Sequence, residues 1–95
     1  MYILALKIEI KIYLSNSLKD KRKIIKKITH HIRHRFPITV SEIDHLDLLN
    51  YSTIGIAMVG NDKVYLDQVK QKVINELDQF FEFEIIEITN YLELY

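Results

Sequence analysis

A basic run at residues 19–27 holds six of the 13 Lys and Arg residues of this chain, the side chains that could bind an anionic ligand. Eight of the 13 Lys and Arg residues lie between residues 19 and 35, where Asp20 is the only acid. Lysine and arginine neutralise phosphates and release their counterions, so such a cluster favours nucleic acid as a ligand. The candidate nucleic-acid-binding residues are Lys19, Lys21, Arg22, Lys23, Lys26, Lys27, Arg33 and Arg35.

The charge of the whole chain is balanced, but its distribution is not. Residues 1–35 carry 10 Lys and Arg against 2 acids, whereas residues 36–95 carry 3 against 11. An asymmetry of this size suggests an anionic partner for the basic part. Two alternatives stay open: the run forms a solvated helix face, or it pairs with the acidic part within one subunit or between subunits.

The basic run belongs to a predicted helix. Ser17 and Asp20 have the spacing of a capping box, which starts the helix at about Leu18, and Pro37 stops it. Its apolar face is formed by Leu18, Ile25, Ile28, Ile32 and Phe36, and the opposite face by Lys19, Lys23, Lys27, His30 and His34.

The basic face opposes helix stability. Lys19 and Lys23 form a like-charge pair four residues apart, as do Arg22 and Lys26. The cluster also lies at the helix N-terminus, where the macrodipole disfavours cations. A phosphate-rich ligand would offset both the like-charge repulsion and the unfavourable interaction with the helix dipole. Lys21 is an exception because it falls near the apolar side and must contact something there.

Three histidines extend the same helix. His30 and His34 have the spacing of a metal-binding pair, but the cationic surroundings oppose a metal, and no carboxylate follows at matching spacing. We therefore expect His30, His31 and His34 to extend the basic stripe and to add charge as the pH falls.

A second polar group, Glu42, Asp44, His45 and Asp47, lies on a predicted strand and its turn. It could form a carboxylate pair or a cation site, but charge guarding an edge strand, or pairing with the basic helix, is the favoured interpretation. The chain has no phosphate-binding glycine loop, nucleophile elbow or zinc-protease motif. We expect no catalytic residues, no metal and no cofactor.

The remaining pattern predicts one domain over residues 1–95. Strands are expected at residues 2–13, 38–46, 51–59 and 83–92, with a bulge at Ile85–Ile86, and a second helix capped by Asp62. The order βαββαβ predicts an α+β, ferredoxin-like fold with two helices on one face of a four-stranded antiparallel sheet. Lys7 and Lys11 would then face Glu82, Glu84 or Glu87 on its open face.

Composition also indicates the cellular location of the protein and the surface that would bind RNA. The chain has no cysteine, no apolar run long enough to cross a bilayer and no signal peptide at its N-terminus, so we expect a cytoplasmic protein. The third strand also lacks the aromatic signature of sheet-based RNA recognition, which favours the helix as the binding surface.

Several blocks of the sequence resemble the YlxP-like family, which consists of small bacterial domains of unknown function. They are residues 17–22, 33–36, 40–47 and 55–59, with Asp62. Asp20 stands where that family usually has Glu, Ser41 where it has Ala, and Leu46 where it has a polar residue. The resemblance implies a ferredoxin-like fold and a bacterial cytoplasmic protein, and gene neighbours in the family hint at ribosomal RNA. It carries over no catalytic residues.

Two hypotheses follow. The first is a non-enzymatic RNA- or ribosome-associated accessory protein that binds phosphates through its first helix. The second is a homo-oligomeric interaction module with no nucleic-acid role, in which open sheet faces pair and the apolar C-terminus, Tyr91 to Tyr95, adds contact. The hypotheses are compatible, and we expect a homodimer, no membrane and no small-molecule substrate.

Overall fold

Six elements follow one another in the predicted βαββαβ order. A computed structural model describes residues 1–95, and the predicted strand bounds are met to within two residues. The elements are β1 (Tyr2–Ile12), α1 (Leu18–Arg35), β2 (Thr39–Asp44), β3 (Tyr51–Gly60), α2 (Lys63–Asp78) and β4 (Phe83–Leu94).

Both helices begin at the predicted capping residues. The Ser17 hydroxyl accepts a hydrogen bond from the Asp20 backbone N–H at 3.0 Å. The Asp62 carboxylate accepts from the backbone N–H groups of Val64 and Tyr65. These bonds satisfy N–H groups that have no partner inside a helix, so they set where α1 and α2 start.

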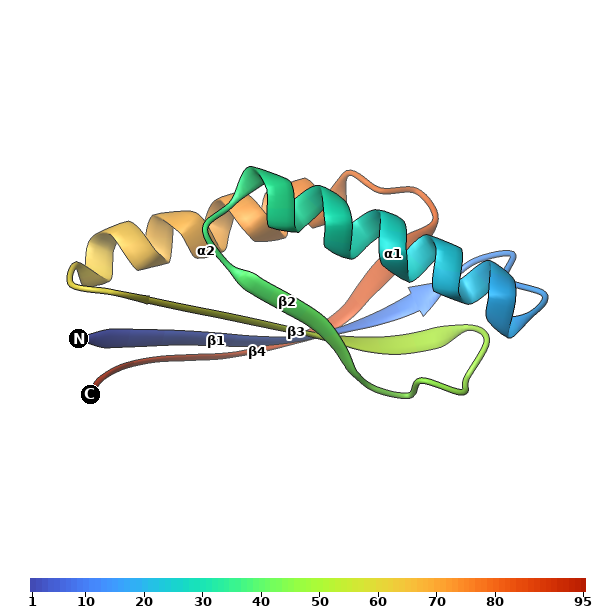
Figure 1. Cartoon of the computed structure of the whole chain (residues 1–95), viewed down its shortest axis with the longest axis horizontal. Helices are drawn as coiled ribbons and strands as arrows, with labels where there is room; N and C mark the ends of the chain where they lie inside the picture. Colours follow the sequence, from blue (N-terminus) through green and yellow to red (C-terminus); the bar gives the residue numbers. More distant parts are fainter.

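The four strands form one antiparallel sheet in the order β2-β3-β1-β4. Both helices cover the same face of it, and the other face is open (Figure 1). This arrangement confirms the ferredoxin-like fold. Alternate residues of β1 and β3 meet the helices in one core of 17 buried residues: Leu4, Leu6, Ile8, Ile10, Ile12, Ile25, Ile28, Ile32, Val40, Ile54, Ile56, Met58, Leu66, Val69, Val73, Leu77 and Phe83.

Two bulges interrupt the strand register. In β4, Glu87 pairs with Glu9 and Ile85 with Ile10, so Ile86 is the extra residue, and the predicted bulge is confirmed. A second bulge, between Glu42 and Asp44 of β2, was not predicted. There Ile43 lies over Gly55, where an added Cβ would come within 2.8 Å of Ile43 Cγ2. The glycine therefore makes room for the bulged side chain.

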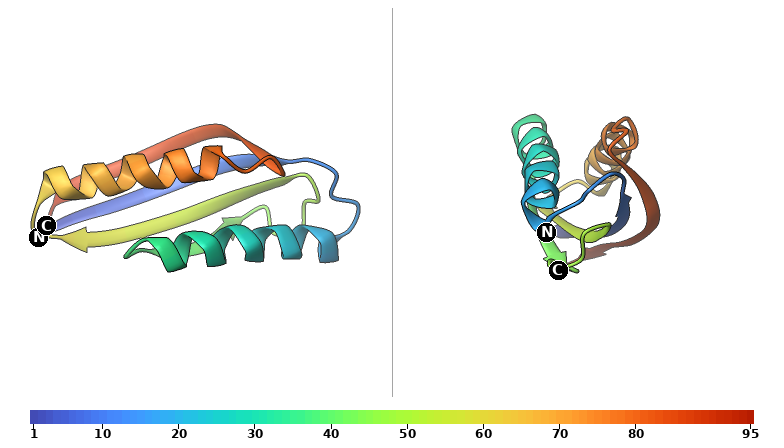
Figure 2. Two further views of the ribbon diagram at one scale, coloured as in Figure 1. Left: turned by 90° about the horizontal axis from the view of Figure 1, so that it is seen from above. Right: turned by 90° about the vertical axis from the view of Figure 1, so that its right-hand side faces the viewer.

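The molecule is elongated, with extents of 43 × 20 × 19 Å. The chain termini lie together at one end (Figure 2), where Met1 and Tyr95 exchange backbone hydrogen bonds. The β1–α1 loop and the β2–β3 hairpin lie at the other end, beside the first turn of α1 (Figures 1 and 2). Neither helix combines the length and the apolar character that a membrane span requires.

Candidate nucleic-acid interface

Helix α1 lies against the sheet with its apolar side inward. Ile25, Ile28 and Ile32 are buried in the core, while most of the charged side chains point to solvent. Packing of the isoleucines fixes the rotation of the helix, because turning it would expose them to water. The predicted one-sided basic surface is therefore present on α1.

Four cations form the unpaired centre of this surface. None of them makes an ion pair, and no acidic side chain lies within salt-bridge distance of them. All four are exposed: Lys19, Arg22, Lys23 and Lys26. We call these four residues the basic patch.

Two other predicted cations of α1 are already paired with acids of the second half of the chain. Lys27 forms an ion pair with Glu82, and Arg35 Nε lies 2.9 Å from Glu76 Oε1. The hydrogen bond from Lys27 also lowers the pKa of Glu82 below its ordinary value. Part of the charge asymmetry along the chain is therefore neutralised within the fold.

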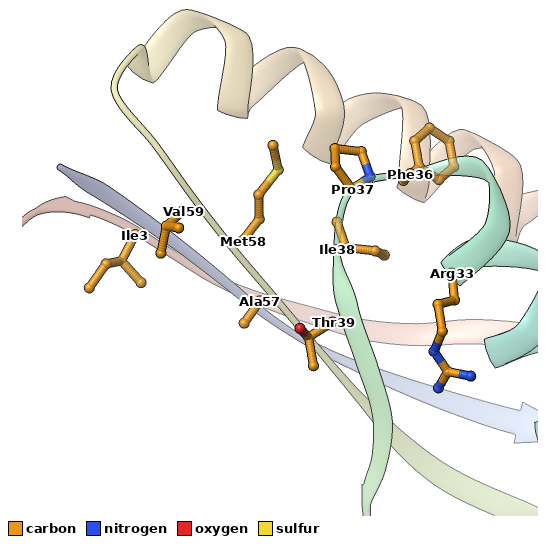
Figure 3. A pocket seen from close by; sticks show the side chains of 9 residues that line it. All are labelled: Ile3, Arg33, Phe36, Pro37, Ile38, Thr39, Ala57, Met58 and Val59. Atoms are coloured by element: carbon orange, nitrogen blue, oxygen red, sulfur yellow. The ribbon is translucent and has the colours of Figure 1, made fainter.

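Arg33 lies on the opposite side of α1 from these pairs. Its Nη2 donates a hydrogen bond to the backbone oxygen of Val40 at 3.1 Å, which ties the helix end to β2. It also borders an open hollow of about 560 Å³ between the start of β2 and the end of β3, which Figure 3 shows from close by. The other lining residues are Ile3, Phe36, Pro37, Ile38, Thr39, Ala57, Met58 and Val59.

Lys21 does not belong to the interface, and its assignment as a binding residue is wrong. Its side chain is only 1% exposed, and its ammonium group lies 3.0 Å from Glu42 Oε2. It also donates to the backbone oxygens of His45 at 2.5 Å and Leu46 at 3.3 Å. The β2–β3 hairpin folds over the first turn of α1 and encloses this lysine, so no external ligand can reach it.

The polar group predicted on β2 and its turn is used mainly in contacts inside the fold. Glu42 pairs with Lys21 and accepts a hydrogen bond from Ser52 Oγ at 2.6 Å. Asp44 accepts from the backbone N–H of His45, a residue with a positive φ of 61°. The His45 ring lies 2.9 Å from the Thr53 hydroxyl. No group of three His, Asp or Glu side chains is placed to hold a metal ion.

The three histidines of α1 separate into two environments. His30 and His34 are exposed, with ring centroids 4.0 Å apart, and continue the basic patch along the helix. His31 faces α2 instead, with Nε2 2.8 Å from Glu76 Oε1 and its ring edge-on to Phe80. Only His30 and His34 therefore extend the basic patch along the exposed side of α1.

The open sheet face carries a carboxylate pair that sequence reasoning missed. Glu9 and Glu87 are direct neighbours across β1 and β4. The hydrogen bond and the negative charge of Glu9 raise the pKa of Glu87. The pKa of Tyr51 is raised as well, by partial burial of its ring and by the negative charge of Glu9. Lys11 faces Glu84 as predicted, whereas Lys7 faces Thr89. The bulge in β4 sets this register, so strand alternation alone could not place the pair.

The α2–β4 connection beside α1 was also missed. Phe80 lies 5.8 Å from the Lys27 ammonium group, while Phe81 is 87% exposed. In the sequence, two adjacent phenylalanines after a helix indicate an aromatic contact there, but they do not show which of the two rings points outward.

Two comparisons with known proteins agree on a family. A family model described as "Protein of unknown function (DUF503)" matches residues 3–90 of the chain. The protein named "Uncharacterized protein YlxP" of Bacillus subtilis (strain 168) is 34% identical over 73 residues, which cover 77% of this chain and 79% of that protein. The matched residues include α1 and the strands around it.

Proposed function

The chain belongs to the DUF503 family, and we propose that it is a non-enzymatic, RNA- or ribosome-associated accessory protein of the cytoplasm. Helix α1 would bind RNA phosphates through the basic patch. One observation carries the proposal: Lys19, Arg22, Lys23 and Lys26 are exposed without an acidic partner, although the chain has as many acids as cations.

The basic patch is unfavourable for folding in the absence of a ligand. Lys19 with Lys23, and Arg22 with Lys26, are like-charge neighbours one turn apart on the same helix. Each cation in the first turns also opposes the helix dipole, by about 0.3–1 kcal/mol. Bound phosphates would offset these repulsions by attracting each cation, which supports an anionic ligand over a merely solvated face.

The shape of the surface favours phosphates over bases as the main contact. From Lys19 to His34 the helix rises by about 22 Å at 1.5 Å per residue, so its cations follow a line rather than a point. Lysine ammonium groups on an exposed helix contact phosphate oxygens but do not by themselves read base identity. We therefore propose binding to structured RNA with little sequence preference.

The polar groups that could suggest catalysis are already used in the fold. Glu42 is paired with Lys21 and Ser52, and His45 with Thr53. The pair with Lys21 holds the β2–β3 hairpin against α1, and the other two bonds join β2 and its turn to β3. No free nucleophile and base are left side by side. This arrangement supports a binding role for the protein.

The proposal is tested by charge reversal in the basic patch. Fluorescence anisotropy with a labelled, structured RNA would compare the wild type with Lys23→Glu/Lys26→Glu. We expect the double variant to bind at least about tenfold more weakly. The matched control is Lys63→Glu/Lys72→Glu on α2, which changes the net charge equally and should leave affinity within about twofold. Equal affinity of the wild type and the Lys23/Lys26 variant would overturn the proposal.

Self-association is the second candidate role, and exposed apolar side chains on β3 and β4 favour it. Val59 is 58% exposed, Tyr91 53% and Leu94 68%, and Val59 borders the hollow of Figure 3. We propose a homodimer that covers Val59 and Tyr91, which the strand register places on the open face, so it is compatible with RNA binding by α1 on the other face. Sedimentation equilibrium of the wild type and Val59→Glu tests it; a monomeric wild type would exclude it.

A further inference from the structure

A small hollow lies where α1 meets the α2–β4 connection, next to the basic patch. Its volume is about 200 Å³, which is smaller than the pockets that hold drug-sized ligands. It suits a single planar ring system. Its lining residues are Lys27, His31, Glu76, Gln79, Phe80, Phe81 and Glu82.

Aromatic rings form one wall of this hollow. Phe80 is held in place, because its ring lies edge-on to His31 at 5.3 Å and stacks on Phe83 at 5.6 Å. Phe81 has no such neighbour and is 87% exposed. An exposed phenylalanine beside a fixed one offers a flat apolar surface, on which any nucleobase can stack.

Hydrogen-bond acceptors form the rim. Glu76 and Glu82 line the hollow, together with Gln79. Oε1 of Glu76 is paired with His31 and Arg35, and Oε2 of Glu82 with Lys27, so the other oxygen of each carboxylate is outside these ion pairs. Carboxylate oxygens accept hydrogen bonds from exocyclic amino groups, as in the pairing of Glu or Asp with N4 of cytosine. Uracil has a carbonyl oxygen in that position, which would face the carboxylates unfavourably. The rim therefore favours an amino-bearing base.

The hollow is continuous with the phosphate-binding surface. Lys27 lines it and also lines an open depression on α1 that includes Lys23, Lys26 and His30. Lys27 is 58% exposed despite its pairing with Glu82, so it can contact a phosphate at the same time. An RNA strand on the basic patch would pass within reach of the aromatic rings.

We propose that this hollow binds one unpaired, amino-bearing base of an RNA whose phosphates lie on the basic patch. The inference rests on the proposed function, which it deepens by adding a structural preference: RNA with a bulged or looped-out base over a continuous duplex. Sequence-specific recognition of RNA usually targets such unstacked bases.

Four RNA hairpins of one stem sequence test the inference: fully paired, or with a single bulged cytosine, uracil or abasic site. Anisotropy should show the wild type binding the cytosine bulge about tenfold more tightly than the abasic one. The uracil bulge should fall between them. Phe81→Ala should remove the preference for the cytosine bulge but leave binding to the paired hairpin intact.

Controls separate this inference from the proposed function. Phe81→Tyr should keep the preference, because it retains the ring, and so should Tyr95→Ala, which removes a distant aromatic that is 85% exposed. A cytosine preference that survives in Phe81→Ala, or is absent from the wild type, would overturn the base site while leaving the basic patch standing. RNA binding that is insensitive to Lys23→Glu/Lys26→Glu would instead overturn the proposed function.

Discussion

Lys21 and Glu42 form an ion pair in which the lysine is fully buried, with Nζ of Lys21 lying 3.0 Å from Oε2 of Glu42. The pair joins the first turn of α1 to β2, and the backbone oxygens of His45 and Leu46 complete the bonds of the ammonium group. The hairpin that carries Glu42 is thereby locked over the helix. The same contact removes Lys21 from the exposed basic surface of α1, although its neighbours Arg22 and Lys23 stay exposed.

The buried pair predicts strong destabilisation when one partner is removed. Lys21→Met leaves the Glu42 carboxylate without its cation, and Glu42→Gln leaves the Lys21 charge buried. Each should lower the free energy of unfolding by about 3–5 kcal/mol. The double variant Lys21→Met/Glu42→Gln should lose less than the sum of the two single changes. Urea denaturation measures all three, and strict additivity would mean that the pair is not coupled.

The salt dependence of RNA binding should report the number of cations in the basic patch. Affinity is expected to fall linearly on a logarithmic salt scale, and each of Lys19→Gln, Lys23→Gln and Lys26→Gln should reduce the slope by just under one unit. Lys72→Gln on α2 should leave the slope unchanged. Titrations at several potassium chloride concentrations give these slopes. Variants that match the wild-type slope would place the RNA elsewhere.

The carboxylate pair on the open face predicts a pH-dependent gain in stability from Glu87→Gln. Because Glu9 raises the pKa of Glu87 above its ordinary value of 4.5, the folded state is penalised at neutral pH, where both carboxylates are charged. The variant should therefore melt at a higher temperature than the wild type at pH 7. Below about pH 4.5 the difference should vanish, since Glu87 is then protonated in both states. Calorimetry at the two pH values measures it.

The Lys27–Glu82 pair predicts the opposite dependence. Lys27 holds the pKa of Glu82 below its ordinary value of 4.5, so the pair stabilises the fold above that pH and is lost as the pH falls further. Lys27→Met should thus cost up to about 1 kcal/mol at pH 7 and almost nothing at pH 2. Lys72→Met, an exposed lysine without an ion pair, is the control. An equal cost of Lys27→Met at both pH values would rule out the ion pair as the cause.

Leu14 offers a site where stability can be raised. It follows β1 with a φ of 55° and is 93% exposed, so it occupies the left-handed region with no burial to compensate. Asparagine adopts this conformation more readily, and Leu14→Asn should stabilise the protein by roughly 1 kcal/mol. The neighbouring exposed change Asn16→Ala should bring no such gain. Thermal unfolding compares the two variants.

Much of this protein could be predicted from its sequence because local physics decides it. Strict alternation in residues 2–12 defines a strand with one buried face. Ser17 and Asp62 start the helices by accepting hydrogen bonds from backbone N–H groups, and Pro37 ends α1 by restricting the residue before it. The spacing of Ile25, Ile28 and Ile32 fixes which side of α1 meets the core, and hence where Lys19, Lys23 and Lys26 point. These features depend on residues close together in the chain.

Tertiary structure alone decided which charges remain available to a ligand. Lys21 and Lys23 belong to the same basic run, yet the first is enclosed by a hairpin more than 20 residues further along and the second is exposed. Pairing of Lys27 with Glu82, and of Glu9 with Glu87, depends likewise on how distant strands and loops are brought together. The two members of such a pair lie far apart in the sequence, and only the fold brings them together. Residue spacing along the chain therefore locates the basic helix, but it does not show which of its cations remain without an acidic partner.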